Sequence, residues 1–180
     1  MTQTIRIMKT SITDAPADVI VNAANSHLQH GSGVCGAIFR AAGARELQQA
    51  CDELGGCPTG SAVITPGFAL CPYIVHAVGP IWRGGSHGEP AQLFSCYQRS
   101  LDLAKEKGCH TIAFPLISAG IYGYPVPAAW RTALKSVTAW LETSPDCDME
   151  ILFAVLDEGV LNEGRNAAQE LGLALLETGD

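Results

Sequence analysis

The chain has 180 residues, of which 47% are hydrophobic and 16% are charged, and its formal net charge of −7 and its size suit one domain with a substantial core. It contains no apolar run of about 18 residues, no signal peptide and no basic presequence, so we expect a cytoplasmic protein rather than a membrane-bound or secreted one. Its 11 basic residues form no Lys/Arg stripe that could follow a nucleic-acid backbone, so an anionic ligand should be held locally, by backbone N–H groups.

Patterns typical of strands and of helices alternate along the chain. Runs rich in β-branched residues predict strands, whereas apolar residues spaced three and four apart predict helices. In chain order, the predicted elements are strand 4–9, strand 18–22, helices 37–42 and 44–54, strands 61–65 and 73–77, helix 92–107, strand 111–115, a helix after residue 125 with its apolar residues at 130–141, strand 150–156 and helix 162–171. This alternation favours a largely parallel sheet that is covered by helices on both faces.

A first glycine-rich loop follows the predicted strand at residues 18–22. It contains Gly31, Gly33 and Gly36 and leads into an apolar helical pattern. Glycines let the backbone approach a ligand closely, and the free N–H groups of a first helical turn attract negative charge. The loop therefore predicts a phosphate-binding site.

The glycine spacing also matches the dinucleotide-binding pattern G-x-G-x-x-G, but its context does not fit. Eight residues separate Asn22 from Gly31, and the acidic residues Asp52 and Glu53 lie within a helical pattern instead of ending a second strand. The polar run that starts at Asn22 and ends at Asn25 is a second candidate element. Both asparagines could instead only cap turns.

A second glycine-bearing loop, residues 118–125, follows the predicted strand at 111–115 and also precedes a helix. Ligands of parallel sheets bind beyond the carboxyl ends of the strands, where both loops are expected. The two loops could clamp one diphosphate between them. Alternatively, Gly120 and Gly123 could be ordinary turn residues.

Two nucleophilic sites compete with a binding site. A serine-hydrolase motif fails at Ser118, because Leu116 stands where G-x-S-x-G requires glycine. Cys35 lies at a predicted helix N-terminus, where a thiolate is favoured, but a free cysteine more often serves only as a packing residue. The seven cysteines form no C-x-x-C pair and no zinc-ligand spacing with histidines, so we expect reduced thiols and no metal site.

Four ordered segments resemble the macrodomain family, specifically its MacroD-like bacterial branch of O-acetyl-ADP-ribose deacetylases and mono-ADP-ribosyl hydrolases. They read NAANSHLQHGSGVCGAIFRAAG, CPTGSAVITPGF, YIVHAVGPIW and FPLISAGIYGYP. The resemblance covers about residues 5–156 and implies a single domain over residues 1–180. It implies a three-layer α/β/α sandwich with a mostly parallel, mixed sheet of about six strands. It also implies ADP-ribose, its derivatives or mono-ADP-ribosylated protein as partners, and no cofactor.

The resemblance further implies which residues form the site. The loops at residues 31–36 and 118–122 would hold the diphosphate, and Asn25 would hydrogen-bond the distal ribose; Asn25 and Cys35 would be the catalytic residues. The full set of implied ligand-binding residues is Ser11, Ile12, Asn25, Gly31, Gly33, Val34, Cys35, Gly36, Ser118, Ala119, Gly120, Ile121 and Tyr122.

Three positions depart from the branch. Ser11 stands where the branch has an aspartate that binds the adenine amino group, so a charge-assisted hydrogen bond is lost. Cys35 replaces the aspartate that orients or activates the hydrolytic water, and Phe39 replaces a histidine. Two hypotheses follow: a hydrolase acting at the distal ribose with Cys35 as a weak substitute base, or a reader that binds ADP-ribose without turnover. The intact Asn25 and the two loops favour the hydrolase.

Overall fold

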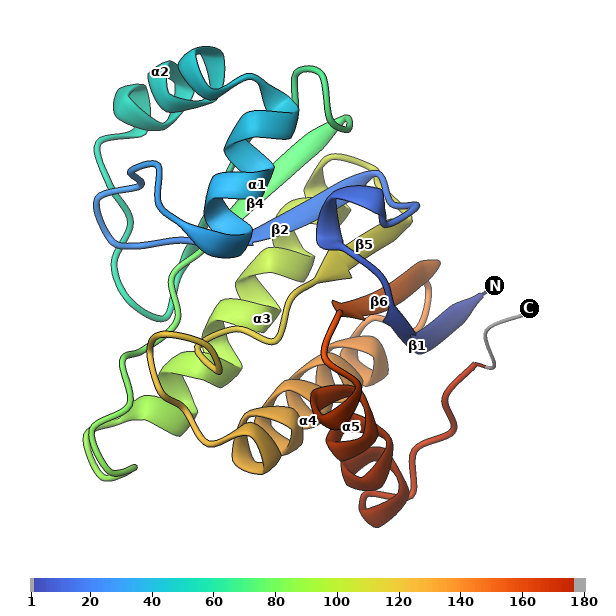
Figure 1. The fold of residues 1–180 in the computed structure, drawn as a ribbon. Helices are drawn as coiled ribbons and strands as arrows, with labels where there is room; N and C mark the ends of the chain where they lie inside the picture. Colours follow the sequence, from blue (N-terminus) through green and yellow to red (C-terminus); the bar gives the residue numbers. More distant parts are fainter. Residues whose placement is uncertain (1, 177–180) are drawn as a thin grey trace.

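A six-stranded sheet forms the middle layer of the protein (Figure 1). The computed structural model describes residues 2–176. The strands are Gln3–Lys9 (β1), Val19–Ala23 (β2), Ala62–Pro66 (β3), Tyr73–Ala77 (β4), Thr111–Phe114 (β5) and Met149–Val155 (β6). Their order is β1-β6-β5-β2-β4-β3, and every neighbouring pair is parallel except β3 and β4. The mostly parallel, mixed sheet expected from the sequence is confirmed.

Helices cover the sheet, and most of them begin earlier than the sequence predicts. They are Gly33–Ala42 (α1), Ala44–Leu54 (α2), Glu89–Glu106 (α3), Val126–Thr143 (α4) and Glu158–Glu170 (α5), with a short 3-10 helix at Ile12–Asp14 (η1). The predicted start of α5 at residue 162 was wrong because Asp157 is its N-cap and accepts a hydrogen bond from the Val160 N–H at 3.0 Å. No helix among residues 2–176 is both long and apolar enough to cross a lipid bilayer.

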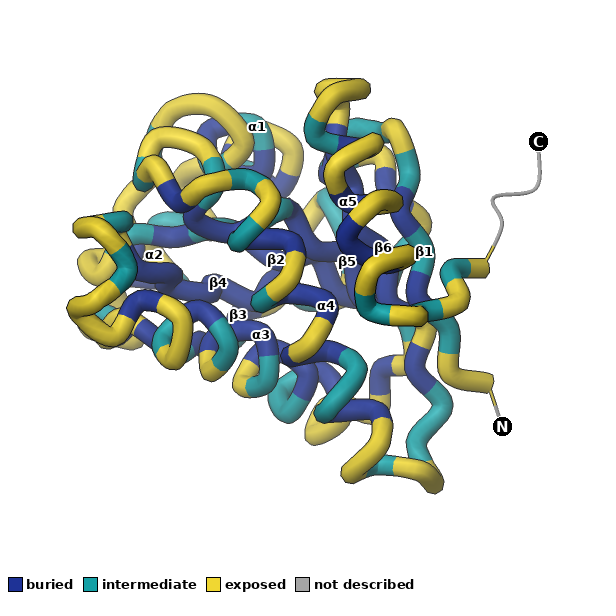
Figure 2. The backbone as a smooth tube through the Cα atoms, turned by 90° about the horizontal axis from the view of Figure 1, so that it is seen from below, coloured by how far each residue is buried: buried dark blue, intermediate teal, exposed yellow. Residues whose placement is uncertain are grey.

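The helices form two layers with separate hydrophobic cores. On one face of the sheet, α1, α2 and η1 pack on residues such as Ile20, Ile74 and Ala113. On the other face, α3, α4 and α5 pack on alternate strand residues such as Val21 and Phe153. Figure 2 shows the strands as a buried band, with the exposed turns of the helices outside it. These layers confirm the three-layer sandwich expected from the resemblance.

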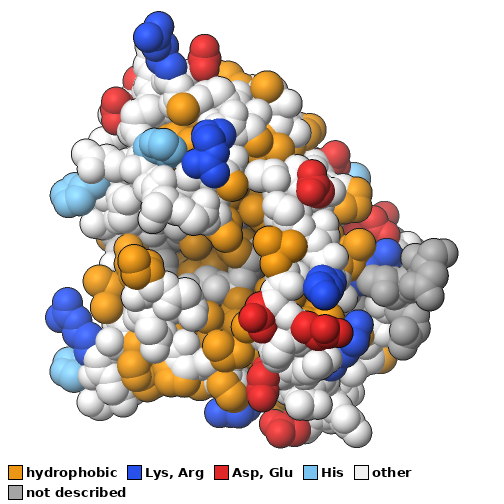
Figure 3. All heavy atoms as spheres, in the orientation of Figure 1, with side chains coloured by type: hydrophobic (Ala, Val, Ile, Leu, Met, Phe, Trp, Pro, Cys, Tyr) orange, Lys and Arg blue, Asp and Glu red, His pale blue; other side chains and the backbone are white. Residues whose placement is uncertain are grey.

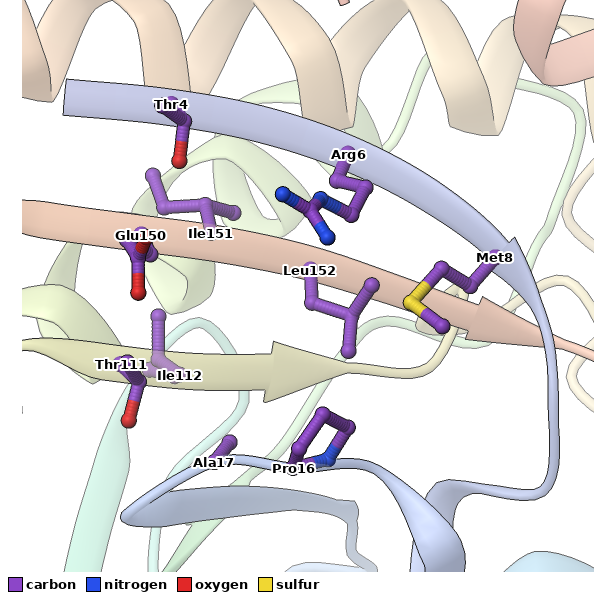
Figure 4. A pocket seen from close by; sticks show the side chains of 10 residues that line it. All are labelled: Thr4, Arg6, Met8, Pro16, Ala17, Thr111, Ile112, Glu150, Ile151 and Leu152. Carbon is purple, nitrogen blue, oxygen red and sulfur yellow. The ribbon is translucent and has the colours of Figure 1, made fainter. Parts of the chain in front are cut away.

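The layer formed by α1 and α2 does not extend across the whole sheet. Over β1, β6 and β5 the same face carries a hollow of about 270 Å³. Figure 4 shows Arg6 and Met8 of β1 beside Leu152 of β6, with Pro16 and Ala17 along its border. No helix of the described chain covers this part of the sheet.

The strand order changes direction between β2 and β5, the two central strands. From β2 the chain continues to β3 and β4 on one side, and it then returns to form β5 and β6 on the other. β5 pairs with β2 only at Val19 and Ile20, whereas β4 pairs with β2 as far as Ala23. The carboxyl ends of β2 and β5 therefore separate, and a crevice at such a reversal is the usual ligand site of an open α/β sheet.

Candidate functional site

A cavity of about 430 Å³ opens at this crevice. Its first wall consists of residues 23–25 and 31–35, which follow β2. Its second wall consists of residues 115–118 and 120–122, which follow β5, and Gly79 at the end of β4 also contributes. Figure 3 shows hydrophobic side chains gathered along a hollow between the upper and lower halves of the molecule. The volume lies within the range of small-molecule sites, roughly 300–1,000 Å³.

The first wall presents the N-terminus of α1. Gly33 starts the helix with a φ of 61°, and the side chain of Ser32, the N-cap residue, makes no capping hydrogen bond. By helix geometry the N–H groups of Gly33, Val34 and Cys35 have no carbonyl partner in the helix. Unpaired N–H groups and the positive end of the helix dipole together make a place for an anion.

Gly36 shapes this wall without lining the cavity. It is buried one residue further into α1, and a Cβ atom on it would lie 2.7 Å from the Gly31 carbonyl oxygen. Its lack of a side chain lets the glycine loop pack against the helix. Direct ligand contact by Gly36 stays a prediction.

Asn25 organises the segment that joins β2 to the glycine loop. Its Oδ1 accepts hydrogen bonds from the His27 and Gln29 N–H groups, both at 3.1 Å. Its Nδ2 donates to the Gln29 carbonyl oxygen, also at 3.1 Å. Asn25 thus has the turn-capping role considered from the sequence. It also lines the cavity and retains one amide N–H with no partner in the described chain.

Cys35 lines the cavity and is half-buried. Its Sγ has one hydrogen-bond partner among the described residues, the Gln29 carbonyl oxygen at 4.0 Å. A thiol nucleophile needs a base within hydrogen-bond reach, roughly 2.6–3.2 Å for light atoms. The geometry around Cys35 therefore does not favour nucleophilic catalysis.

The other cysteines are also free, and several are deeply packed. Burial raises the pKa of Cys51 to about 11 and that of Cys96 to about 12. These thiols are therefore protonated at neutral pH. Among residues 2–176, no group of three or more His, Cys, Asp or Glu side chains could hold a metal ion.

Ser118 gives the second wall its shape. Its φ of 68° lies in the left-handed region, which costs a non-glycine residue on the order of 1 kcal/mol or more. The Ser118 carbonyl accepts the Tyr124 N–H at 2.9 Å, which closes the loop. Its Oγ is buried and has no hydrogen-bond partner within residues 2–176. A strained residue with an unpaired hydroxyl group beside a cavity indicates a place where a ligand supplies the missing partner.

Two further predicted residues of the second loop differ in position. Ile121 lines the cavity and is 96% exposed, although a large apolar side chain normally packs. Ala119 does not line the cavity and packs against the core of the α3, α4 and α5 layer. Ile121 is therefore available to a ligand, whereas contact by the Ala119 side chain is not indicated.

Ser11 and Ile12 lie outside the cavity. They follow β1, whose carboxyl end is at the same edge of the sheet as those of β2 and β5. Ile12 is buried in the core beneath α1, and the Ser11 Oγ lies 3.0 Å from the Thr13 Oγ1. Their contact with the adenine end of a ligand stays a prediction.

A buried polar pair lies behind the first wall. The sequence favours a hydrogen-bonded core histidine at His76, which the structure confirms, but it gives no sign of the pairing with Asn22. Asn22 and His76 are register partners on β2 and β4, and the Asn22 Nδ2 lies 3.1 Å from the His76 Nδ1. The His76 Nε2 lies 3.0 Å from the Thr65 Oγ1. With Asn22 as donor, the neutral ring carries its proton on Nε2 and donates it to Thr65. Burial lowers the pKa of His76 to about 4, so the ring is neutral at pH 7.

The chain is similar in sequence to known proteins. The Macro domain family model matches residues 21–133. A macro domain-containing protein of Chlorobaculum tepidum is 54% identical over 138 residues, which cover 76% of this chain and 80% of the relative. A second, from Ralstonia nicotianae, is 50% identical over 168 residues, or 91% of this chain and 98% of the relative.

Solved structures give the same result. The Oceanobacillus iheyensis macrodomain with ADP has a TM-score of 0.86 and 36% identity, over 92% of this chain and 90% of that chain. The Trypanosoma brucei macrodomain in complex with ADP-ribose has a TM-score of 0.82 and 36% identity, over 91% of this chain and 68% of that chain. The fold, the matching family model and these relatives together show that the chain belongs to the Macro domain family.

Proposed function

We propose that the cavity binds ADP-ribose. The observation that carries the proposal is the placement of the two loops on opposite walls: free N–H groups of α1 on one side and the unpaired Ser118 hydroxyl group on the other. A diphosphate between them would be held by backbone donors, as an acidic protein with few basic residues requires. The related structures with ADP and ADP-ribose support this choice of ligand.

The positions of the predicted site residues support one direction for the ligand. Asn25 and Gly79 lie at the carboxyl ends of β2 and β4, whereas Ser11 lies beyond β1, at the other side of the sheet. In the proposed pose the distal ribose lies near Asn25 and Cys35. The adenine lies toward Ser11 and Ile12.

We further propose slow hydrolysis of esters at the distal ribose, as in the MacroD-like branch. A water molecule attacks the ester carbonyl carbon, and the bond between this carbon and the ribose oxygen breaks. A carboxylic acid is released, and the ribose oxygen leaves as a hydroxyl group. The free amide N–H of Asn25 and a phosphate oxygen of the substrate would orient the water. Cys35 is a poor base here, because the one hydrogen-bond partner of its Sγ among the described residues is the distant Gln29 carbonyl oxygen, and no side chain there helps the thiol to lose its proton.

The same contact favours a second candidate function. Without a base beside the distal ribose, the site suits binding of ADP-ribose or of mono-ADP-ribosylated protein without turnover. Hydrolase and reader differ only in the fate of the bound ester, so a turnover assay separates them.

Calorimetry with ADP-ribose and with AMP tests the binding proposal. We expect a Kd for ADP-ribose in the micromolar range or tighter, about −8 kcal/mol. AMP should bind much more weakly, because it lacks the second phosphate and the distal ribose. Equal affinities, or no detectable binding of ADP-ribose, would reject the assignment.

Incubation with O-acetyl-ADP-ribose and with glutamate-ADP-ribosylated protein then tests turnover. Release of acetate or of ADP-ribose supports the hydrolase. Tight binding with no product from either substrate supports the reader.

A further inference from the structure

The loop between β4 and α3, residues 79–88, is folded around a buried carboxylate. Glu89, the first residue of α3, is only 1% exposed. Its Oε2 accepts the N–H groups of Arg83 at 2.9 Å and Gly85 at 2.8 Å, and its Oε1 accepts that of His87 at 2.6 Å. Burial alone would raise the pKa of Glu89, but the backbone donors outweigh this effect, so the net pKa is lowered from 4.5 to about 2. Glu89 is therefore ionised and holds three points of one loop.

The loop needs such a support because its own backbone is permissive. Three of its glycines, Gly84, Gly85 and Gly88, have φ values of 98°, 92° and 85°. Glycine-rich segments lose the most conformational entropy on ordering. Hydrogen bonds to a charged acceptor are the stronger kind, so one carboxylate can fix the loop.

Trp82 connects this loop to the second wall of the cavity. The backbone N–H of Trp82 donates to the Tyr122 carbonyl oxygen at 2.9 Å, and the centroid of the Trp82 ring lies 4.6 Å from that of the Tyr124 ring. Gly85 lies against the six-membered ring of Trp82, where a Cβ atom would come within 2.7 Å of the Cη2 atom. Figure 1 shows the β4–α3 connection beside the β5–α4 connection.

Gly79 makes a second connection at the start of the loop. A side chain on Gly79 would overlap the Ser118 Oγ and the Ile117 side chain. The strained Ser118 is thus packed directly against the beginning of the loop that Glu89 fixes at its end. Within residues 2–176, the loop at residues 79–88 makes its hydrogen bond to the cavity walls from Trp82 to Tyr122, and Tyr122 belongs to the second wall.

We propose that Glu89 is a positioning residue for the second wall of the site. Its carboxylate fixes Arg83, the residue after Trp82, and Gly85, which lies against the Trp82 ring; this fixes Trp82, and Trp82 holds the loop that carries Ser118 and Tyr122. Glu89 acts through the backbone and contacts no ligand. This proposal rests on the proposed function only where the measurement is the affinity for ADP-ribose.

The test uses Glu89→Gln, which keeps the side-chain shape but replaces one acceptor oxygen by an NH₂ donor facing a backbone N–H. We expect the affinity for ADP-ribose to fall by about tenfold. Amide hydrogen exchange in the ligand-free protein should become faster at residues 118–124 and stay unchanged at residues 31–36. Glu106→Gln, an exposed glutamate on the same helix, is the matched control and should change neither quantity.

Trp82 variants keep the test decisive if Glu89→Gln does not fold. Trp82→Ala should weaken ADP-ribose binding and accelerate exchange at residues 118–124, and Trp82→Phe should restore most of both. If both variants fold, their effects on affinity should be less than additive, because they break one chain of contacts.

Two results would overturn the proposal. Folded Glu89→Gln with exchange faster only at residues 79–88 would show that the carboxylate supports its own loop and nothing more. Unchanged ADP-ribose affinity in that variant would show the same. If the parent protein does not bind ADP-ribose, the proposed function fails, but the exchange pattern of the ligand-free protein still decides whether Glu89 positions the second wall.

Discussion

Acidification should destabilise the protein through His76, at a pH where few other buried groups change their protonation. The ring is fully buried, and its pKa is lowered from 6.5 to about 4. Between these values the unfolded chain binds a proton that the folded chain does not. The contribution to stability is therefore complete above pH 6.5 and is lost as the pH falls toward 4.

The size of the effect follows from the two pKa values. A difference of one pKa unit corresponds to about 1.4 kcal/mol, so the interval from 6.5 to about 4 corresponds to about 3 kcal/mol. Most of this loss should be complete at pH 4.5. The carboxyl group of Glu89, with its pKa lowered to about 2, supports the fold above pH 4.5 and loses that contribution only below this window.

Urea unfolding at pH 7.5 and at pH 4.5 measures the difference. His76→Gln removes the titrating group, so the decrease in unfolding free energy between the two pH values should be about 2–3 kcal/mol smaller in this variant than in the parent. His27→Gln replaces an exposed histidine and should leave the decrease as it is in the parent. A parent and a His76→Gln variant that lose the same free energy would refute the assignment of the effect to His76.

Four further predictions concern the binding and turnover of the proposed ligand. Gly120→Glu should abolish ADP-ribose binding with the fold intact, because a Cβ atom there meets no neighbour and the new carboxylate would enter the space of a phosphate. Measuring Tm with and without ADP-ribose tests this. A ligand-induced gain in Tm equal to that of the parent would contradict the prediction. Gly33→Glu should likewise abolish ADP-ribose binding from the opposite wall, and it should also lower the stability of the fold, because the φ of 61° at this position is unfavourable for a residue with a side chain. Cys35→Asp should raise the rate of ester hydrolysis at least tenfold, which corresponds to a barrier lower by about 1.4 kcal/mol, whereas Cys35→Ala should lower the rate only slightly. Loss of activity in both variants, together with a covalent adduct of the parent detected by mass spectrometry, would indicate a nucleophilic thiol. Ser11→Asp should favour ADP-ribose over its inosine analogue by about 1 kcal/mol, because it restores an ionised acceptor for the adenine amino group; an unchanged preference in competition binding would place adenine recognition elsewhere.

Much of the fold follows from local sequence patterns. The six strands and five helices were predicted because β-branched runs and apolar spacing are local properties. The convergence of the two loops was also predictable, since parallel strands bring their carboxyl ends to one edge. The loop that ends at Pro125 was predicted to run into a helix, and α4 begins at Val126, with a proline in its first turn, where proline is tolerated.

The contacts that shape the site could not be predicted in this way. Glu89 is joined to backbone N–H groups, which carry no sequence signal. Ser118, with its unpaired hydroxyl group and left-handed backbone, packs closely against Gly79, a residue 39 positions earlier in the chain. Asn22 and His76 meet only because β2 and β4 pair in one particular register. Such contacts require the three-dimensional arrangement.

The two walls of the cavity belong to different layers of the sandwich. The first wall continues into α1, which packs in the core with Ile20, whereas the second continues into α4, which packs in the core with Phe153. The separation of the walls is therefore set by two cores that lie on opposite faces of the sheet. Replacements that accumulate in either core during evolution can change that separation, and hence the choice of ligand, while every residue lining the cavity stays the same.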